Sequence, residues 1–187
     1  MEKVTIDFER LCLELEKQGK TKADLSRDMA KNKNFVGLME KNPDQPAVYC
    51  DKRSEEYRGI WKSVKGQSER KCVIDPDIQC DFTKLPFPDE SFSLVIFDPP
   101  HLKHVGDNAW LARKYGKVDS DWPQMLHDGF RECMRVLKPD GVMIFKWSEH
   151  DIPAADVWKA IGQKPLFGHH SGKNSKTFWG CYMKGVE

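Results

Sequence analysis

The fold is decided by the stretch from residue 93 to residue 101, which reads Ser-Leu-Val-Ile-Phe-Asp-Pro-Pro-His. A short apolar run that ends in an acidic residue is typical of a parallel strand buried on both faces. In open α/β sheets, ligands bind outside the carboxyl ends of such strands. Asp98 and the two prolines after it therefore stand where a binding or catalytic loop is expected.

The sequence around this stretch continues the pattern. Further short apolar runs lie at residues 47–50, 72–74 and 142–147, and we expect each to be a strand. Residues 120–137 carry apolar side chains at helical spacing, and Lys138-Pro139-Asp140-Gly141 turns the chain into the next strand. The order strand, crossover helix, strand predicts an α/β fold with a doubly wound, mostly parallel sheet.

The two ends of the chain differ from this middle part. Residues 165–168 and 177–183 are expected to form a terminal antiparallel pair. Near the start, Phe8, Leu11, Cys12 and Leu15 lie on one face of an amphipathic helix, and two shorter helices follow. We therefore predict a small helical segment over residues 1–45 and an α/β domain over residues 46–187.

Composition sets broad limits on the kind of protein. The formal net charge is +1, so overall charge gives no reason to expect a nucleic-acid partner. The six cysteines form no C-x-x-C pair, so we expect reduced thiols. His101 and His104 are three residues apart but lack a third ligand at suitable spacing, so we expect no metal site. No apolar run has the length of a membrane span, and the N-terminus has no signal-peptide core. We expect a cytoplasmic protein with no membrane partner.

The two prolines give the loop its chemistry. Proline has no backbone N–H, so the carbonyls of Asp98 and Pro99 are left to accept hydrogen bonds. An exocyclic amine on a flat ring needs such acceptors, which hold its proton and orient its lone pair toward a methyl donor. His101 supplies an aromatic ring that can stack on such a flat ring.

Residues 97–101 resemble motif IV of amino-group DNA methyltransferases, usually Asp-Pro-Pro followed by Tyr, Trp or Phe. Residues 80–92 are similar to the segment that leads into motif IV, and residues 135–142 to the passage from a helix into the fifth strand. Together with the stretches at 110–117, 145–147 and 166–173, they resemble a phage and prophage family of small S-adenosylmethionine-dependent methyltransferases. The resemblance covers residues 46 to 185 and implies a class I methyltransferase-like fold.

The resemblance also assigns roles to residues of this chain. It implies a catalytic role for Asp98, Pro99, Pro100 and His101, of which His101 departs from the usual aromatic residue. It implies S-adenosylmethionine as the cofactor, held at its ribose by Asp51 and at its adenine by Asp81 with Phe82 beside it.

One expected motif is absent from the sequence. Methyltransferases have a glycine-rich turn after the first strand, and its place is held by residues 30–37, which contain one glycine. The stretch from Thr21 to Glu40 instead resembles the helix-turn-helix of phage-repressor-like DNA-binding domains. On that interpretation Lys33 and Asn34 start the recognition helix. Residues 1–45 hold nine basic and nine acidic residues. The alternative is a helical cap that packs on the sheet and covers the edge left by the missing first strand.

Two segments that should surround the Asp98 loop are rich in basic residues. The segment from His101 to Lys117 contains four Lys or Arg residues and one aspartate, and the segment from Lys159 to Lys184, both ends included, contains five lysines and no acidic residue. A basic rim suits nucleic acid, although ordinary solvated lysines would look the same. The resemblance to DNA methyltransferases implies DNA rather than RNA as the partner. The candidate contacts, besides Lys33 and Asn34, are Lys103, Trp110, Arg113, Lys114, Tyr115, Lys117, His170, Lys173 and Lys176.

Three hypotheses follow. In the first, the protein is an enzyme that methylates an exocyclic amine of a base, with adenine in DNA as the leading substrate. In the second, the cofactor site is broken and the protein is a DNA-binding or protein-binding module of phage origin. In the third, two chains form a homodimer that completes one cofactor site.

Overall fold

The computed structural model of the chain describes residues 47–63, 66–172 and 175–185. Val48–Glu187 form one compact structural unit. The predicted helical segment over residues 1–45, with Lys33 and Asn34, lies outside the described residues. The described elements are, in order, β1 (Cys50–Asp51), β2 (Glu55–Ser63), β3 (Gly66–Ile74), β4 (Ile78–Gln79), β5 (Phe92–Phe97), α4 (Trp110–Tyr115), α5 (Trp122–Val136), β6 (Leu137–Ser148), α6 (Ala154–Ile161), β7 (Phe167–His170) and β8 (Thr177–Met183).

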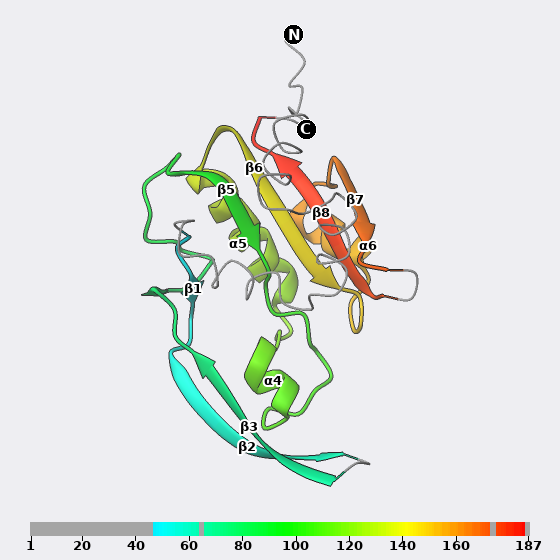
Figure 1. Cartoon of the computed structure of the whole chain (residues 1–187). Helices are drawn as coiled ribbons and strands as arrows, with labels where there is room; N and C mark the ends of the chain where they lie inside the picture. The colour runs from blue at the N-terminus through cyan, green and yellow to red at the C-terminus, as the bar shows by residue number, and fades with distance from the viewer. Residues whose placement is uncertain (1–46, 64–65, 173–174, 186–187) are drawn as a thin grey trace, which may run out of the picture. The chain divides into compact units, whose positions relative to one another are not determined.

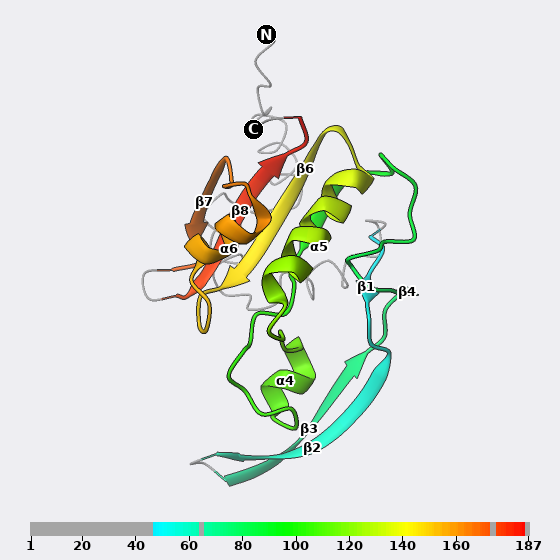
Figure 2. The same ribbon diagram turned by 180° about the vertical axis from the view of Figure 1, so that it is seen from behind.

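A mixed four-stranded sheet holds the candidate loop. Its order is β5-β6-β8-β7, in which β5 and β6 run parallel and the other pairs run antiparallel. The parallel pair is joined through α5, and both α5 and α6 lie on the same face of the sheet (Figures 1 and 2). The predicted strands at residues 93–97 and 142–147, the helix between them and the terminal antiparallel pair are confirmed.

The core lies between this sheet and the two helices. Along β6, Met143, Phe145 and Trp147 have no exposed surface, whereas the residues between them are half-buried on the opposite face. This alternation follows from the two-residue period of a strand. Phe130 of α5 meets Tyr182 of β8 edge to face, with ring centroids 5.0 Å apart. Each large side chain buried in this way stabilises the fold by roughly 2 kcal/mol.

The prediction of a doubly wound, mostly parallel sheet is wrong. Strands hold more of the described residues than helices do, and they form separate sheets of two, two and four strands. The only parallel pairings among the described strands are β5 with β6 and β1 with β4. A doubly wound sheet also needs helices on both faces, and the described helices that cover the sheet lie on one.

A long antiparallel hairpin accounts for much of the difference. Strands β2 and β3 pair over their full lengths, from Glu55↔Ile74 to Ser63↔Gly66. The run at residues 72–74, predicted as a buried parallel strand, is therefore the end of a hairpin strand. Gly66 has φ 120°, a conformation that favours glycine, and it begins the returning strand. In the hairpin, exposed residues such as Arg58 and Ile60 alternate with half-buried ones such as Tyr57. This alternation is typical of an antiparallel pair with one face toward the protein and the other toward solvent.

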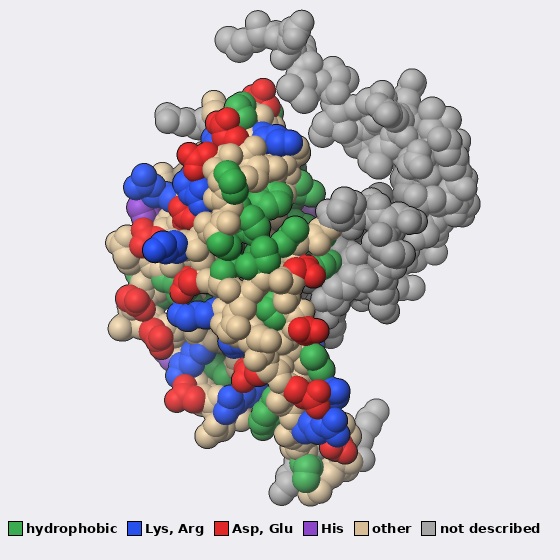
Figure 3. Space-filling view, turned by 90° about the vertical axis from the view of Figure 1, so that its left-hand side faces the viewer, with side chains coloured by type: hydrophobic (Ala, Val, Ile, Leu, Met, Phe, Trp, Pro, Cys, Tyr) green, Lys and Arg blue, Asp and Glu red, His purple; other side chains and the backbone are tan. Residues whose placement is uncertain are grey.

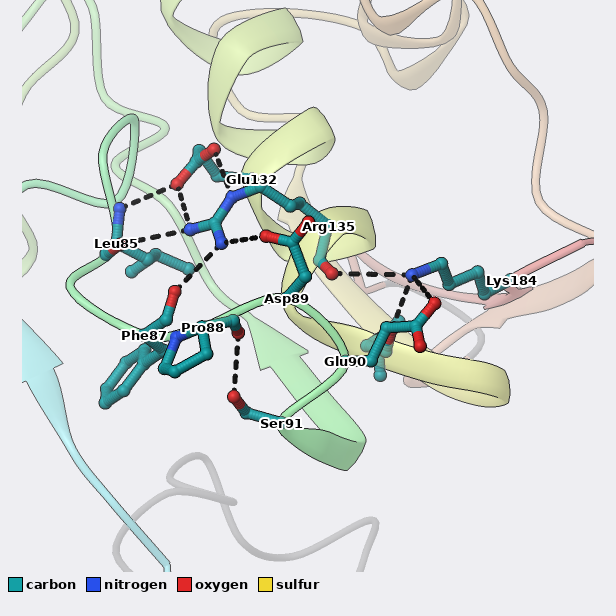
Figure 4. Close-up of polar contacts among 10 residues, drawn as sticks. Leu85, Phe87, Pro88, Asp89, Glu90, Ser91, Glu132, Arg135 and Lys184 are labelled. Atoms are coloured by element: carbon teal, nitrogen blue, oxygen red, sulfur yellow. Dashed lines mark hydrogen bonds and ion pairs between the residues drawn. The ribbon is translucent and has the colours of Figure 1, made fainter.

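The segment that precedes β5 is fixed to α5 by Arg135 (Figure 4). The guanidinium donates to both carboxylate oxygens of Glu132 at 2.8 Å, to Asp89 at 2.7 Å, and to the carbonyls of Phe87 and Leu85 at 2.8 and 3.1 Å. Glu132 in turn accepts from the Leu85 N–H at 2.8 Å. These contacts hold residues 85–89 against the helix and so fix the entry into β5.

Candidate active site

Asp98 follows the last residue of β5 and is paired with a lysine of the neighbouring strand. Phe97 and Phe145 are partners in the parallel register, so Asp98 and Lys146 come next to each other at the carboxyl ends of β5 and β6. Lys146 Nζ lies 2.5 Å from Asp98 Oδ2. Lys146 was not among the predicted site residues, because only the register of the two strands shows that it reaches Asp98.

His101 lies in an aromatic surrounding near this pair. Its ring is tilted against Tyr115 and meets Trp147 edge to face, with centroids 6.1 Å apart in both cases. Burial lowers the pKa of His101, an effect that the nearby Asp98 carboxylate opposes. The imidazole is therefore neutral at neutral pH and offers a flat, uncharged ring.

The loop after Pro100 is anchored by Asp151. Its Oδ2 accepts hydrogen bonds from the backbone N–H groups of Lys103 and His104 at 2.6 and 3.1 Å. The bond from Lys103 is the largest of the effects that lower the pKa of Asp151 to about 2. The carboxylate stays ionised at neutral pH, so the loop is held in one position beside Asp98.

The two predicted cofactor carboxylates lie at the carboxyl end of the β1–β4 pair, Asp51 in β1 and Asp81 two residues after β4. Cys80 donates its N–H to the Asp51 carbonyl at 3.0 Å, which places Asp51 and Asp81 at the carboxyl ends of two parallel strands. Lys52 Nζ lies 3.0 Å from Asp81 Oδ2, so the residue next to one carboxylate pairs with the other. Both side chains are about one third exposed, at 33% for Asp51 and 39% for Asp81.

Each of these carboxylates also has partners of its own. Arg53 binds both oxygens of Asp51 through Nε at 3.1 Å and Nη2 at 3.0 Å, and its Nη1 donates to the carbonyl of Arg113 in α4. Asp81 Oδ1 accepts from the N–H and hydroxyl of Thr83. The backbone bond from Thr83 is the main reason why the pKa of Asp81 is lowered. Arg53 thus links the predicted cofactor site to a predicted nucleic-acid contact.

Phe82 packs toward the core beside the candidate loop. Its ring meets Phe97, the residue before Asp98, with centroids 5.3 Å apart. A Cβ at Gly129 of α5 would come within 2.5 Å of the Phe82 ring, so the glycine makes room for it. In this structure Phe82 connects residues 80–83 to β5 through packing.

Several predicted nucleic-acid contacts are engaged within the protein. Arg113 lies over the Tyr57 ring at 5.3 Å and 3.9 Å from Glu55, and Trp110 also packs against Tyr57. Lys117 pairs with Asp107 at 2.8 Å. Tyr115 is exposed and has Lys114 over its ring at 4.9 Å. Lys103 and Lys176 are exposed, and Lys173 lies outside the described residues.

His170 forms a carboxylate pair that the sequence did not predict. Its Nε2 lies 2.5 Å from Glu149 Oε2, and this contact is the main reason why the pKa of Glu149 is lowered. Glu149 Oε1 accepts from the Ala154 N–H at the start of α6. His170 therefore ties β7 to the end of β6, and its contact with Glu149 competes with any contact to phosphate.

The rest of the described surface has mixed charge, one hollow and no group of side chains suited to a metal ion. Figure 3 shows basic and acidic side chains interspersed around a hydrophobic patch on one face. A hollow of about 410 Å³ lies at the end of α6, and no predicted site residue lines it. Within residues 47–63, 66–172 and 175–185, no three His, Cys, Asp or Glu side chains are grouped to hold a metal ion. None of the described helices is long and apolar enough to cross a membrane.

No protein-family model matches the chain, and no curated protein matches it. The function is therefore inferred from the arrangement of Asp98, Lys146, His101 and the carboxylates on β1 and β4.

Proposed function

We propose that the protein transfers a methyl group from S-adenosylmethionine to an exocyclic amine of a nucleic-acid base, with adenine in DNA as the leading substrate. The observation that carries the proposal is the Asp98 carboxylate at the carboxyl end of β5, followed by two residues that have no N–H donor. The resemblance of residues 97–101 to motif IV of amino-group methyltransferases supports the same activity.

In this proposal the loop positions the amine. Asp98 Oδ1 accepts a hydrogen bond from the amine N–H, which directs the nitrogen lone pair. The base leaves its stack to reach the loop, and the rings of His101 and Tyr115 provide flat surfaces for it. Asp151 holds the loop in place. Placement of the reacting groups contributes more here than proton transfer does.

The residues on β1 and β4 fit one part of the cofactor. Asp51 and Asp81 are partly exposed carboxylates, which suit the hydroxyl groups of a ribose and the amino group of adenine. Among the described residues no glycine-rich turn accompanies them for the methionine part. When bound, the cofactor supplies the electrophilic methyl group.

A second candidate function is binding of nucleic acid without turnover. It is favoured by the partners of the two carboxylates, since Arg53 occupies both oxygens of Asp51 and Lys52 and Thr83 occupy those of Asp81. The absence of a glycine-rich turn at residues 30–37 of the sequence points the same way.

Replacing Asp98 distinguishes the two candidates. Incubating the full chain with methyl-labelled S-adenosylmethionine and DNA should place the label in a base amine. Asp98→Ala should lower this rate about 100-fold or more, because the acceptor that positions the amine is lost. Asp98→Asn keeps the shape of the side chain and should lose nearly as much.

The matched control is Asp156→Ala on α6, a half-exposed aspartate that should keep the wild-type rate. Equal rates in wild type and Asp98→Ala would refute the proposed role of Asp98. Binding of DNA with no label transferred by the wild type would favour the second candidate.

A further inference from the structure

Lys146 and Asp98 form a half-buried ion pair. The two residues lie next to each other near the carboxyl ends of the parallel strands β6 and β5. The Lys146 side chain is 17% exposed and that of Asp98 is 26% exposed. Trp179 of β8 lies opposite Lys146 in the antiparallel register, and Lys146 Nζ is 5.6 Å from the centroid of its ring. The Trp179 ring is itself fixed by a bond from Nε1 to Ser171 Oγ at 2.7 Å. The ammonium group is thus held in place from two directions.

Hydrogen-bonding capacity remains on both members of the pair. An ammonium group has three N–H donors, and Lys146 uses one of them toward Asp98 Oδ2. The other carboxylate oxygen, Asp98 Oδ1, accepts no hydrogen bond from the residues that the structure describes. The pair therefore presents a donor next to an acceptor at the carboxyl ends of β5 and β6.

We infer that Lys146 and Asp98 together read the amidine edge of a nucleobase, the ring nitrogen and neighbouring amine that adenine and cytosine share. Asp98 Oδ1 accepts from the amine, and Lys146 Nζ donates to the ring nitrogen. Thymine has no exocyclic amine and cannot satisfy the acceptor. The inference rests on the proposed function in placing a base at Asp98, and it assigns to Lys146 a role in choosing that base.

The charge of the pair also selects the class of substrate. Asp98 alone would attract a cationic amine such as a lysine side chain. Beside Asp98, the Lys146 ammonium cancels that attraction and repels a second positive charge. A neutral base amine meets no such repulsion, so the pair favours a nucleobase over a protein amine.

The test compares the affinity of the full chain for single-stranded thymine tracts that differ at one position. One tract has a central adenine, one has a central purine that lacks the amine, and one is thymine throughout. Fluorescence anisotropy should show that the wild type binds the adenine tract about tenfold more tightly than the other two. Lys146→Met should lose this preference and keep the affinity for the all-thymine tract.

Two further variants separate recognition from folding. Lys146→Arg retains a donor and should keep most of the preference, whereas an unchanged affinity of Lys146→Met for the all-thymine tract shows that the fold is intact. Lys138→Met, at an exposed lysine near the start of β6 and outside both basic segments, should leave all affinities unchanged. The inference is overturned if Lys146→Met keeps the preference, if it weakens all tracts equally, or if a lysine-rich peptide is methylated instead of DNA.

The two proposals fail in different ways. Loss of the adenine preference in Lys146→Met without any methyl transfer by the wild type would support base reading and refute the enzyme. Methyl transfer to a base with a preference that Lys146→Met retains would support the enzyme and refute base reading.

Discussion

Replacing Trp147 with alanine should lower the free energy of unfolding by about 4 kcal/mol. The side chain has no exposed surface and stacks on Phe145 with ring centroids 6.1 Å apart. Its Nε1 donates to the Ile152 carbonyl at 2.9 Å. The substitution leaves a large cavity and an unsatisfied buried carbonyl, both of which favour the unfolded state. Urea denaturation followed by circular dichroism measures the change.

Trp147→Phe provides the comparison. It keeps a ring in the core and removes the hydrogen bond to Ile152, so a smaller loss of about 2 kcal/mol is expected. His101 contacts the Trp147 ring, so both variants should also loosen the candidate loop. A loss below about 1 kcal/mol for Trp147→Ala would contradict the packing described for the core.

Replacing Arg135 with alanine should lower the free energy of unfolding by about 2 kcal/mol. The Arg135 side chain is 31% exposed, so its contacts contribute less than those of a fully buried pair. The loss arises because Glu132 and the carbonyls of Leu85 and Phe87 lose their donors together. The measurement is again urea denaturation, with Arg131→Ala on the exposed side of α5 as the matched control.

The effect of Arg135→Ala should depend on pH. The hydrogen bond from Arg135 is the main reason why the pKa of Glu132 is lowered in the folded protein. A lowered pKa stabilises the fold above the unfolded value, about 4.3 for glutamate, and this stabilisation is lost as the pH falls through the folded value. The difference between wild type and variant should therefore be full at pH 7 and shrink below about pH 4. A difference that is the same at both pH values would contradict the ion pair.

The part of the fold that the sequence predicts correctly is the part with local and unambiguous patterns. β5, α5 and β6 each carry one clear period. Residues 138–141, predicted as a turn before the strand, instead lie within β6, where Asp140 has φ 61° and the pairing with β5 is irregular. The hairpin was missed because its strands are rich in charged residues, and only residues 72–74 form an apolar run. Whether a strand pairs parallel or antiparallel depends on contacts distant in the sequence, so the doubly wound arrangement did not follow from the strands alone.

In the candidate site, too, the sequence predicts the residues that are consecutive in the chain and misses a contact between distant residues. Asp98 stands out because a strand, an aspartate and two prolines are consecutive in the sequence. Lys146 lies 48 residues further along the chain and becomes a neighbour only through the register of β5 with β6. Its position between buried Phe145 and Trp147 was a usable signal, since the two-residue period places it on the opposite face.

The central claim, methyl transfer at Asp98, requires that the chain bind the methyl donor. Calorimetric titration of the full chain with S-adenosylmethionine tests this most directly. We expect saturable binding that weakens about tenfold in Asp51→Asn and in Asp81→Asn, because each variant loses a charged acceptor for the cofactor. Absence of binding heat at millimolar cofactor, together with an unchanged melting temperature, would contradict the claim.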